Sequence, residues 1–583
     1  MSEQSRGTIA IPEADLQIPP TPREEIDKVV AAVRAQKGVW PQISVEERLA
    51  LVERVRADTR AVAEDWASSE LAAKRIDPED PAASEGWMTG PVILLRNLRQ
   101  LRDVLTDIRD DGKPQLPGEA TTRADGQVVV PVFPATTYDR LLFAGVTAEV
   151  RLEHGTTLAD LEEQVGLVYR DANDEEGEVA FVLGAGNVSA IPAMDSLSKL
   201  FVENQVVVMK MNPVNEHVGP ILERAFAALI ERDLLRIVYG GADVGSYLVD
   251  HDGIDAVHMT GSDKTFEAIV FGPGEEGQRR KEERRPELTK PITAELGNVT
   301  PVIVVPGPWS DGDIAYHGEN IATMLTNNVG FNCIAVRAIV THGSWARRRD
   351  LLDSIRGFLR QAGRRHAYYP GAADRMERFL DGHPEAEKYG TADDGALPWT
   401  LVPDVPARSQ DEILFEAECF TPVTAEVPLD APRDVAAFVD AAVEFCNERL
   451  WGTLGATIII HPRQLKDPEI AAAFDRALAN LRYGTVCVNH WSGVAYVLGT
   501  TPWGAFPGHD VADIQSGIGK VHNLLMLPRT EKAVLRAPFR VRPKPVWFVT
   551  HRRGGEVARK IGDLEADGSP RHLPEILWAA SRP

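Results

Sequence analysis

Regular alternation of strand-like and helix-like segments from Val179 onward is the feature that most restricts the fold. Short aliphatic runs at 179–183 and 205–210 are each followed by a segment with helical character. Buried β-branched runs joined by helices are typical of parallel sheets covered by helices. The pattern continues to about Lys520, so we predict an α/β protein with a doubly wound sheet.

Charge and cysteine content exclude several classes of protein. The 583 residues include 63 basic and 86 acidic side chains, a net charge of −23. A chain this acidic repels a phosphate backbone, so no nucleic-acid partner is expected. The four cysteines form no C-x-x-C pair, which excludes a disulfide framework, a zinc ribbon and a thioredoxin-like motif. No metal site is predicted.

The first twenty residues lack the basic-then-apolar pattern of a signal peptide. No apolar run approaches the roughly 20 residues that a membrane span requires. We therefore expect a cytoplasmic protein without a membrane partner.

A glycine-rich turn at 184–189 lies between a predicted strand and a predicted helix and has the pattern G-x-G-x-x-S. Such a turn can place phosphate at a helix N-terminus. However, its third small residue is Ser189, and the next strand ends in Lys210, where a dinucleotide fingerprint has an acid. An ordinary fingerprint is therefore disfavoured. A simple tight turn would explain the glycines but not Asn187 at the sheet edge, where open α/β sheets bind ligands.

Several further motifs follow in a fixed order, and together they resemble those of the aldehyde dehydrogenase superfamily. They are AGN (185–187), VVMK (207–210), MTGS (259–262), AELGNVTP (294–301), NNVGFNC (327–333), ECFTPV (418–423) and GTVCVN (484–489). The resemblance covers roughly residues 25–535.

The resemblance implies a cysteine-based oxidation of an aldehyde. Cys333 matches the family's nucleophile, which must form a tetrahedral adduct before the substrate can give up a hydride. The side-chain amide of Asn187 and the backbone N–H of Cys333 match the oxyanion donors. Glu295 matches the general base that activates water for thioester hydrolysis.

The same resemblance implies NAD or NADP as cofactor. Lys210 and Glu418 match residues that hydrogen-bond ribose hydroxyls, and Phe420 would pack beside the nicotinamide ribose. Close approach of the backbone to adenosine and pyrophosphate is expected at Gly240, Gly241, Gly245, Thr260, Gly261 and Ser262.

The motifs depart from the family pattern at several positions. Phe331 replaces a glutamine, while Asn298, Phe266 and Thr421 replace glycines. Pro213 stands where an acid often binds the ribose. Without that acid no negative charge at this position would oppose the 2′-phosphate of NADP, so the choice between NAD and NADP stays open. Small residues beside Asn187 suggest a tunnel for bulky or aromatic aldehydes.

The predicted fold class is aldehyde dehydrogenase-like, with a Rossmann-type cofactor domain, an α/β catalytic domain and a small β oligomerisation arm. In the family such arms complete a partner's sheet, so a homodimer or homotetramer is expected. The predicted bounds are 1–22 for a flexible lead-in, 23–140 and 179–298 for the NAD(P)-binding domain, 299–520 for the catalytic domain, 141–178 and 521–550 for the arm, and 551–583 for a C-terminal tail.

Two other functions remain open from the sequence. An acylating, coenzyme A-dependent dehydrogenase or acyl-CoA reductase is one, because AGNV also resembles acyl-CoA reductases. The acylating branch typically lacks a glutamate at the position of Glu295, which favours hydrolysis to an acid. The other is a non-catalytic binding protein on the same fold.

Overall fold

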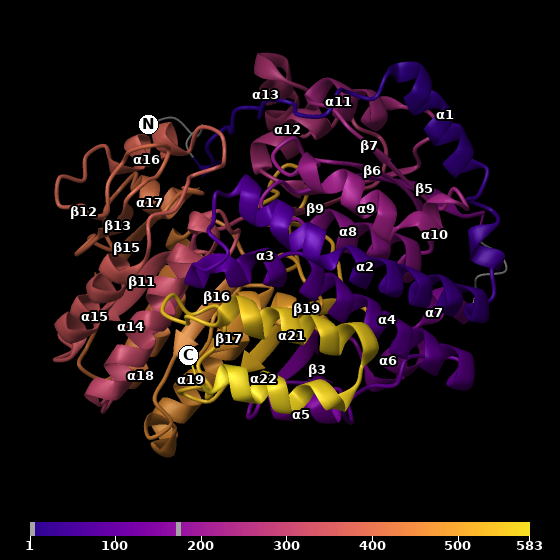
Figure 1. Cartoon of the computed structure of the whole chain (residues 1–583). Helices are drawn as coiled ribbons and strands as arrows, with labels where there is room; N and C mark the ends of the chain where they lie inside the picture. The colour runs from indigo at the N-terminus through magenta and orange to yellow at the C-terminus, as the bar shows by residue number, and fades with distance from the viewer. Residues whose placement is uncertain (1–5, 171–175, 583) are drawn as a thin grey trace.

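The computed structural model describes residues 6–170 and 176–582, which form two large sheets and a third sheet of two short strands, β1 (Gly7–Thr8) and β14 (Ala417–Glu418) (Figure 1). The smaller sheet has the order β18-β9-β8-β5-β6-β7. All its neighbouring strands are parallel except the short β18. The bounds are Glu178–Leu183 (β5), Gln205–Lys210 (β6), Leu235–Val238 (β7), Ala256–Gly261 (β8), Ile292–Leu296 (β9) and Gly517–Ile518 (β18).

Helices cover this sheet, which explains its continuous aliphatic runs. Every residue of β6 is buried, including its terminal Lys210. The connections and covering helices are α1 (Arg23–Arg34), α8 (Ile191–Leu197), α9 (Gly219–Ala225), α10 (Ala227–Ile230), α11 (Ala242–Asp250), α12 (Asp263–Phe271) and α13 (Gly274–Glu282). This architecture confirms the predicted parallel, helix-covered α/β fold.

The larger sheet has eleven strands in the order β12-β13-β15-β11-β10-β16-β17-β19-β4-β3-β2. The strands from β13 to β19 are parallel, and both ends of the sheet are antiparallel. The bounds are Thr121–Thr122 (β2), Val128–Phe133 (β3), Thr147–Leu152 (β4), Thr300–Val304 (β10), Val336–His342 (β11), Glu387–Tyr389 (β12), Trp399–Val402 (β13), Val423–Leu429 (β15), Gly455–Ile459 (β16), Thr485–Val488 (β17) and Thr530–Arg536 (β19).

The two segments predicted to form the β arm pair with each other and extend this chain's own larger sheet. β4 pairs antiparallel with β19, and β19 pairs in parallel with β17 of the same chain. β3, which the sequence analysis assigned to the cofactor-binding part, extends the same sheet. The edge of β17 is therefore satisfied within the chain, and a partner's strand cannot add there.

Two long helices, α2 (Val45–Ala73) and α4 (Pro91–Asp111), pack against each other and against the helices of the smaller sheet. α2 begins at Ser44, whose side chain accepts the backbone N–H of Glu47 as an N-cap. The short α3 (Ser84–Met88) lies between α2 and α4 in sequence. The helices that connect strands of the larger sheet include α14 (Asp311–Thr326), α15 (Arg348–Gln361), α18 (Val435–Arg449) and α19 (Pro468–Asn480).

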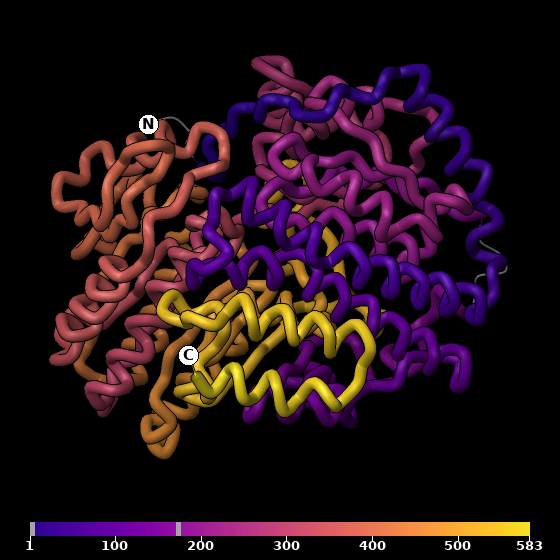
Figure 2. Tube along the Cα trace, viewed as in Figure 1, coloured from indigo at the N-terminus to yellow at the C-terminus, as the bar shows by residue number. Residues whose placement is uncertain are grey.

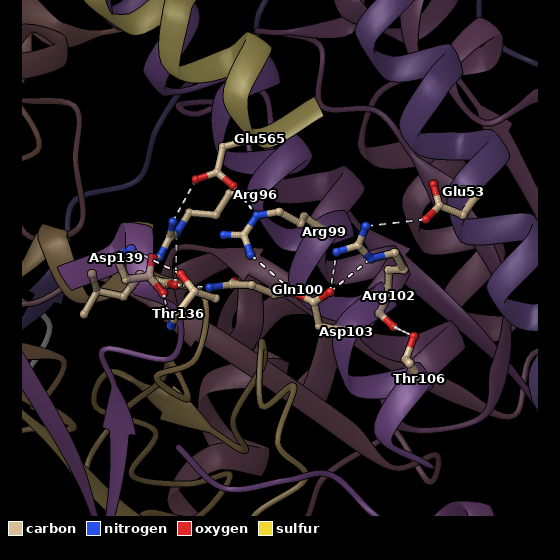
Figure 3. A network of polar contacts seen from close by, with 11 residues as sticks. Glu53, Arg96, Arg99, Gln100, Arg102, Asp103, Thr106, Thr136, Asp139 and Glu565 are labelled. Atoms are coloured by element: carbon tan, nitrogen blue, oxygen red, sulfur yellow. Dashed lines mark hydrogen bonds and ion pairs between the residues drawn. The ribbon is translucent and has the colours of Figure 1, made fainter. Parts of the chain in front are cut away.

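The C-terminal tail packs against the body of the protein. The helix α21 (Gly554–Asp567) contacts α3 and α4, and α22 (Leu573–Ala580) packs on α21, drawn in yellow in Figures 1 and 2. Glu565 of α21 accepts hydrogen bonds from Arg96 (2.8 Å) and Arg99 (2.6 Å) of α4. Arg96 also binds Asp139 at 2.8 Å, and all four side chains are buried (Figure 3). The run 546–551, which looks strand-like in sequence, forms turns instead.

Residues 1–22 were expected to be a flexible lead-in. Residues 6–22 run along the smaller sheet's helices, and Thr21 donates its N–H to the Tyr239 carbonyl at 3.0 Å. Residues 1–5 lie outside the described residues. Among the helices that the structure describes, none is long and apolar enough to cross a membrane.

Candidate active site

A cavity of about 930 Å³ is lined by residues at the ends of β5, β6, β8 and β9 of the smaller sheet and by loop residues such as Cys333 and Leu454 that precede strands of the larger sheet. Parallel strands present their carboxyl ends at one sheet edge, which is where open α/β sheets bind ligands. Eleven of the twelve predicted site residues line this cavity. The remaining one, Gly240, lies in the turn just before the lining residue Gly241 and has a φ of 139°.

Cys333 lies on a tight loop between α14 and β11. Asn328 and Val329 adopt left-handed backbone conformations with φ of 51° and 58°, which are uncommon for residues with side chains. The buried guanidinium of Arg337 donates to the carbonyl oxygens of Gly330 and, at 2.6 Å, Thr421. This bond network fixes the loop, and it leaves Cys333 half-buried on the cavity wall.

Asn187 is held directly against the loop that carries Cys333. Its Nδ2 donates to the Phe331 carbonyl at 2.9 Å. Its own carbonyl accepts hydrogen bonds from Asn328 Nδ2 (2.9 Å) and the Tyr368 hydroxyl (3.0 Å). The amide carries two N–H donors, so one remains for a ligand oxygen while the other fixes the side chain.

Glu295 shares the cavity with Cys333 and is buried. Burial raises the pKa of its carboxyl well above the usual range, and the nearby Asp195 carboxylate raises it further. The ammonium groups of Lys520 and Lys199 and the N–H of Val521 oppose this shift. A raised pKa makes the deprotonated carboxylate a stronger base, so Glu295 in that form can take a proton from water, as general-base chemistry requires.

Burial also raises the pKa of the Cys333 thiol, and the carboxyl groups of Glu418 and Glu295 add to the effect. The thiol in this arrangement is therefore neutral, and it must lose its proton before it can act as a nucleophile.

Lys210 and Glu418 line the same cavity from different sheets. Burial lowers the pKa of Lys210 to about 8 and raises that of Glu418 to about 8. Among the described residues, Glu418 Oε1 is a buried oxygen without a hydrogen-bond partner. A Cβ at Gly297 would overlap the Glu418 carboxylate, so glycine is required for this approach. An unpartnered acceptor in an open cavity fits a ligand that brings hydroxyl donors, such as a ribose.

The turn 259–262 leads from β8 into α12. The Ser262 hydroxyl accepts the N–H of Thr265 at 3.1 Å and caps the helix. Phe266, which replaces the expected glycine, is fully buried. The Thr260 hydroxyl donates to Asp195 at 3.0 Å, and Thr260 also lines the cavity.

Apolar side chains line much of the cavity around Cys333, and we call this set the apolar wall. Trp547 reaches it from the C-terminal tail and stacks on His490, with ring centroids 5.5 Å apart. Burial lowers the pKa of His490 to about 4, so this ring is neutral near pH 7. The wall comprises Met88, Ile93, Val188, Leu454, Trp491, Val494, Tyr496, Val497, Trp503 and Trp547.

Four residues around the cavity carry no signal in the sequence. Asp195 and Lys520 act electrostatically on Glu295, and Trp547 and Glu13 enter the cavity from the two ends of the chain. These four residues lie outside the recognised motifs in the sequence and come close to the motif residues only in the folded chain.

Residues 179–355 match the model of the aldehyde dehydrogenase family. The chain is 24% identical over 329 residues to a D-glyceraldehyde dehydrogenase (NADP(+)) of Picrophilus torridus. That match covers 52% of this chain and 58% of the relative. An N-succinylglutamate 5-semialdehyde dehydrogenase of Novosphingobium aromaticivorans is 28% identical over 28% of this chain and 32% of its own length.

Solved structures share the fold over most of the chain. A γ-glutamyl-γ-aminobutyraldehyde dehydrogenase from Burkholderia cenocepacia has a TM-score of 0.59 at 18% identity, covering 89% of both chains. An NADP-dependent glyceraldehyde-3-phosphate dehydrogenase from Bacillus halodurans, solved with NADP, has a TM-score of 0.58 at 18% identity. This match covers 89% of this chain and 92% of that one.

Proposed function

Because the chain belongs to the aldehyde dehydrogenase superfamily as a divergent member, we propose that it oxidises an aldehyde to a carboxylic acid with NAD(P)⁺. The observation that carries the proposal is the joint placement of Cys333, Asn187 and Glu295 on one cavity. Lys210 and Glu418 line that cavity too.

The chain's own groups account for the first covalent step. The Cys333 thiol gives its proton to water, and its sulfur forms a bond to the aldehyde carbon. The carbonyl oxygen then carries the negative charge, which the free N–H of Asn187 and the backbone N–H of Cys333 stabilise. The loop bonds from Arg337 and Asn328 hold these donors in place before the substrate arrives.

Bound NAD(P)⁺ would supply the hydride acceptor, and Lys210, Glu418 and Phe420 would hold it. Loss of hydride from the adduct carbon leaves a thioester on Cys333. Glu295 then takes a proton from water, the hydroxyl bonds to the acyl carbon, and the C–S bond breaks to release the carboxylic acid and the thiolate. The presence of Glu295 favours this hydrolytic route over transfer to coenzyme A.

The apolar wall supports a substrate with an uncharged, bulky or aromatic side chain. Its ten residues include three tryptophans and one tyrosine and no charged group. A charged substrate tail would lose its hydration there without gaining a partner. A preference for short aliphatic over aryl aldehydes would contradict this substrate class.

We keep a homodimer or homotetramer as the proposed assembly. Because β19 is paired within the chain, subunit contacts would use other surfaces than the edge of β17. Light scattering of the purified protein measures the assembly directly.

The test of the proposed function is reduced-nicotinamide absorbance with a panel of aldehydes, run with NAD⁺ and NADP⁺ and without coenzyme A. An increase in reduced-nicotinamide absorbance, with one carboxylic acid formed for each nicotinamide reduced, supports the hydrolytic dehydrogenase. Product formation only with coenzyme A supports the acylating alternative. No turnover with any aldehyde or acyl-CoA, in a protein that binds neither dinucleotide, supports a non-catalytic protein.

A further inference from the structure

The N-terminal segment 6–22 lines one side of the cavity, through Thr8 and residues 11–14, on its way from β14 to the smaller sheet. Its strand β1 (Gly7–Thr8) pairs in parallel with β14 (Ala417–Glu418), the strand that carries Glu418. Further along, the N–H of Ile18 donates to Glu216 at 2.8 Å beside the smaller sheet. Figure 2 shows this indigo segment running from the region of α16 (Ala372–Leu380) over the smaller sheet's helices to α1.

Glu13, in the middle of this segment, lines the cavity. Its carboxylate accepts the backbone N–H of Ala242, the first residue of α11. A Cβ at Gly241 would overlap this carboxylate, so the glycine permits the contact. A carboxylate at a helix N-terminus is favoured by the free N–H groups and the helix dipole, which fixes Glu13 in this corner of the cavity.

Lys210 is the cation of the same corner. Its Nζ donates to the Met211 carbonyl at 3.3 Å, and its side chain lies 3.9 Å from the Cβ position of Gly245 in α11. The carboxylates that act on this ammonium are, in order of strength, those of Glu13, Asp243 and Glu216. Three carboxylates therefore act on this ammonium group, and Glu13 is the one of them that lines the cavity.

Among the described residues that line the cavity there is no arginine. The other lining lysine, Lys290, donates to the carbonyl oxygens of Val249 and His251, both at 2.7 Å. Its ammonium is thus engaged at the far end of α11. Among the lining residues that the structure describes, no second free cation offsets the carboxylates.

We propose that Glu13 makes the chain selective for NAD⁺ over NADP⁺ by placing a carboxylate beside Lys210 where the adenosine ribose binds. This inference rests on the proposed function, because it presumes a dinucleotide in the cavity. In dinucleotide sites, an acid accepts the ribose 2′-hydroxyl of NAD, whereas an arginine accommodates the 2′-phosphate of NADP. A 2′-phosphate would bring about two negative charges to a corner that already has an excess of carboxylates.

Glu13 thereby replaces an acid that the local motif lacks. The third residue after Lys210 is Pro213, which cannot bind a hydroxyl through its side chain. The N-terminal segment supplies the carboxylate from about 200 residues away in the sequence. The chain would then differ in cofactor choice from the Picrophilus relative, whose name specifies NADP(+).

The test is direct titration of NAD⁺ and NADP⁺ by calorimetry without aldehyde, on the full-length protein. The wild type is expected to bind NAD⁺ at least about 10-fold more tightly than NADP⁺. Glu13→Gln keeps the size of the side chain and removes its charge, so NADP⁺ affinity should rise about 10-fold while NAD⁺ affinity falls slightly. Glu13→Lys should reverse the preference.

Asp15→Asn is the matched control, since Asp15 is an exposed acid in the same segment that does not line the cavity. It should leave the affinity ratio unchanged. The ratio for the wild type should also shrink as salt is raised, whereas in Glu13→Gln it should depend less on salt. Thermal melting checks that each variant is folded.

Equal affinities in the wild type, or the same ratio in Glu13→Gln as in the wild type, would overturn the assignment of Glu13. If the wild type binds neither dinucleotide, the proposed function itself fails. The calorimetric readout thus separates the two failures.

Discussion

Asp195 Oδ1 lies 3.1 Å from His522 Nε2, inside the protein and beside the candidate general base Glu295. The other carboxylate oxygen lies 3.4 Å from His258 Nε2. The hydrogen bond with His522 and the close approach of His258 lower the pKa of Asp195 despite its complete burial, so it stays ionised. A fixed negative charge is therefore built in next to Glu295, and Lys520 supplies the opposing positive charge.

This pair of charges predicts opposite shifts in the pH profile. Glu295 acts when it is deprotonated, so kcat should fall as pH drops through its raised pKa. Asp195→Asn removes a charge that raises that pKa, and the acid limb should move down by about 0.5 to 1 pH unit. Lys520→Met removes a charge that lowers it, and the limb should move up by a similar amount.

The measurement is kcat against pH under conditions where hydrolysis limits turnover, with thermal melting for each variant. Lys199, the other nearby cation, is left in place throughout. If both substitutions shift the acid limb in the same direction, Asp195 and Lys520 do not act on Glu295 through their charges, and the prediction is wrong.

The roles of Cys333 and Glu295 separate in pre-steady-state kinetics. Cys333→Ala should abolish turnover and keep dinucleotide affinity within about two-fold, because the sulfur is the nucleophile and Lys210 and Glu418 are unchanged. Glu295→Gln should keep a burst of reduced nicotinamide near one per site while steady-state turnover falls about 10²–10⁴-fold. Retained turnover in Cys333→Ala would refute the assignment.

Much of this site could be predicted because its chemistry is carried by contiguous motifs. Asn187, Lys210 and Glu295 each stand at or near the end of a strand of one parallel sheet, so the fold class alone places them at one edge. Cys333 and Glu418 come from the other half of the chain, and the motif resemblance rather than any periodicity pointed to them.

Glu13 and Trp547 could not be predicted, because nothing in their local sequence distinguishes them. Each reaches the cavity through the path of a chain end that has no strong secondary-structure pattern.

The predicted β arm shows another limit of sequence patterns. Aliphatic alternation at 530–536 indicates a strand, but it does not determine whether the neighbouring strand belongs to the same chain or to a partner.

Trp547 offers a test of the apolar wall. Its segment is anchored on α14, where Thr323 accepts the N–H of Val549 at 3.0 Å and Glu319 binds Lys544 at 3.0 Å. Trp547→Ala should lower kcat/KM for aryl aldehydes about 10-fold or more, through loss of stacking and packing surface. The ratio of aryl to short aliphatic kcat/KM should fall accordingly.

Trp578→Ala is the matched control, because Trp578 belongs to the same tail but is 60% exposed on α22. It should leave the ratio unchanged. An equal effect of the two variants would mean that the tail affects activity only through overall stability.

The buried ion network at α21 predicts a stability loss that depends on pH. Arg99 and Arg96 hold the pKa of Glu565 below its usual value although the carboxyl is buried. Glu565→Gln leaves both guanidinium groups without their shared carboxylate, which should cost about 3–5 kcal/mol at pH 7. Faster hydrogen exchange in residues 554–567 and a lower melting temperature would report this loss.

The sign of the pH effect follows from the lowered pKa. The stability from Glu565 is present above its unfolded-state pKa of about 4.3 and is lost as pH falls through the lower folded value. The difference between the wild type and Glu565→Gln should therefore shrink in acid. As a control, Arg571→Gln breaks an exposed pair with Asp567 on the same tail and should cost under about 1 kcal/mol. A cost for Glu565→Gln no larger than this control would show that the network does not hold the tail in place.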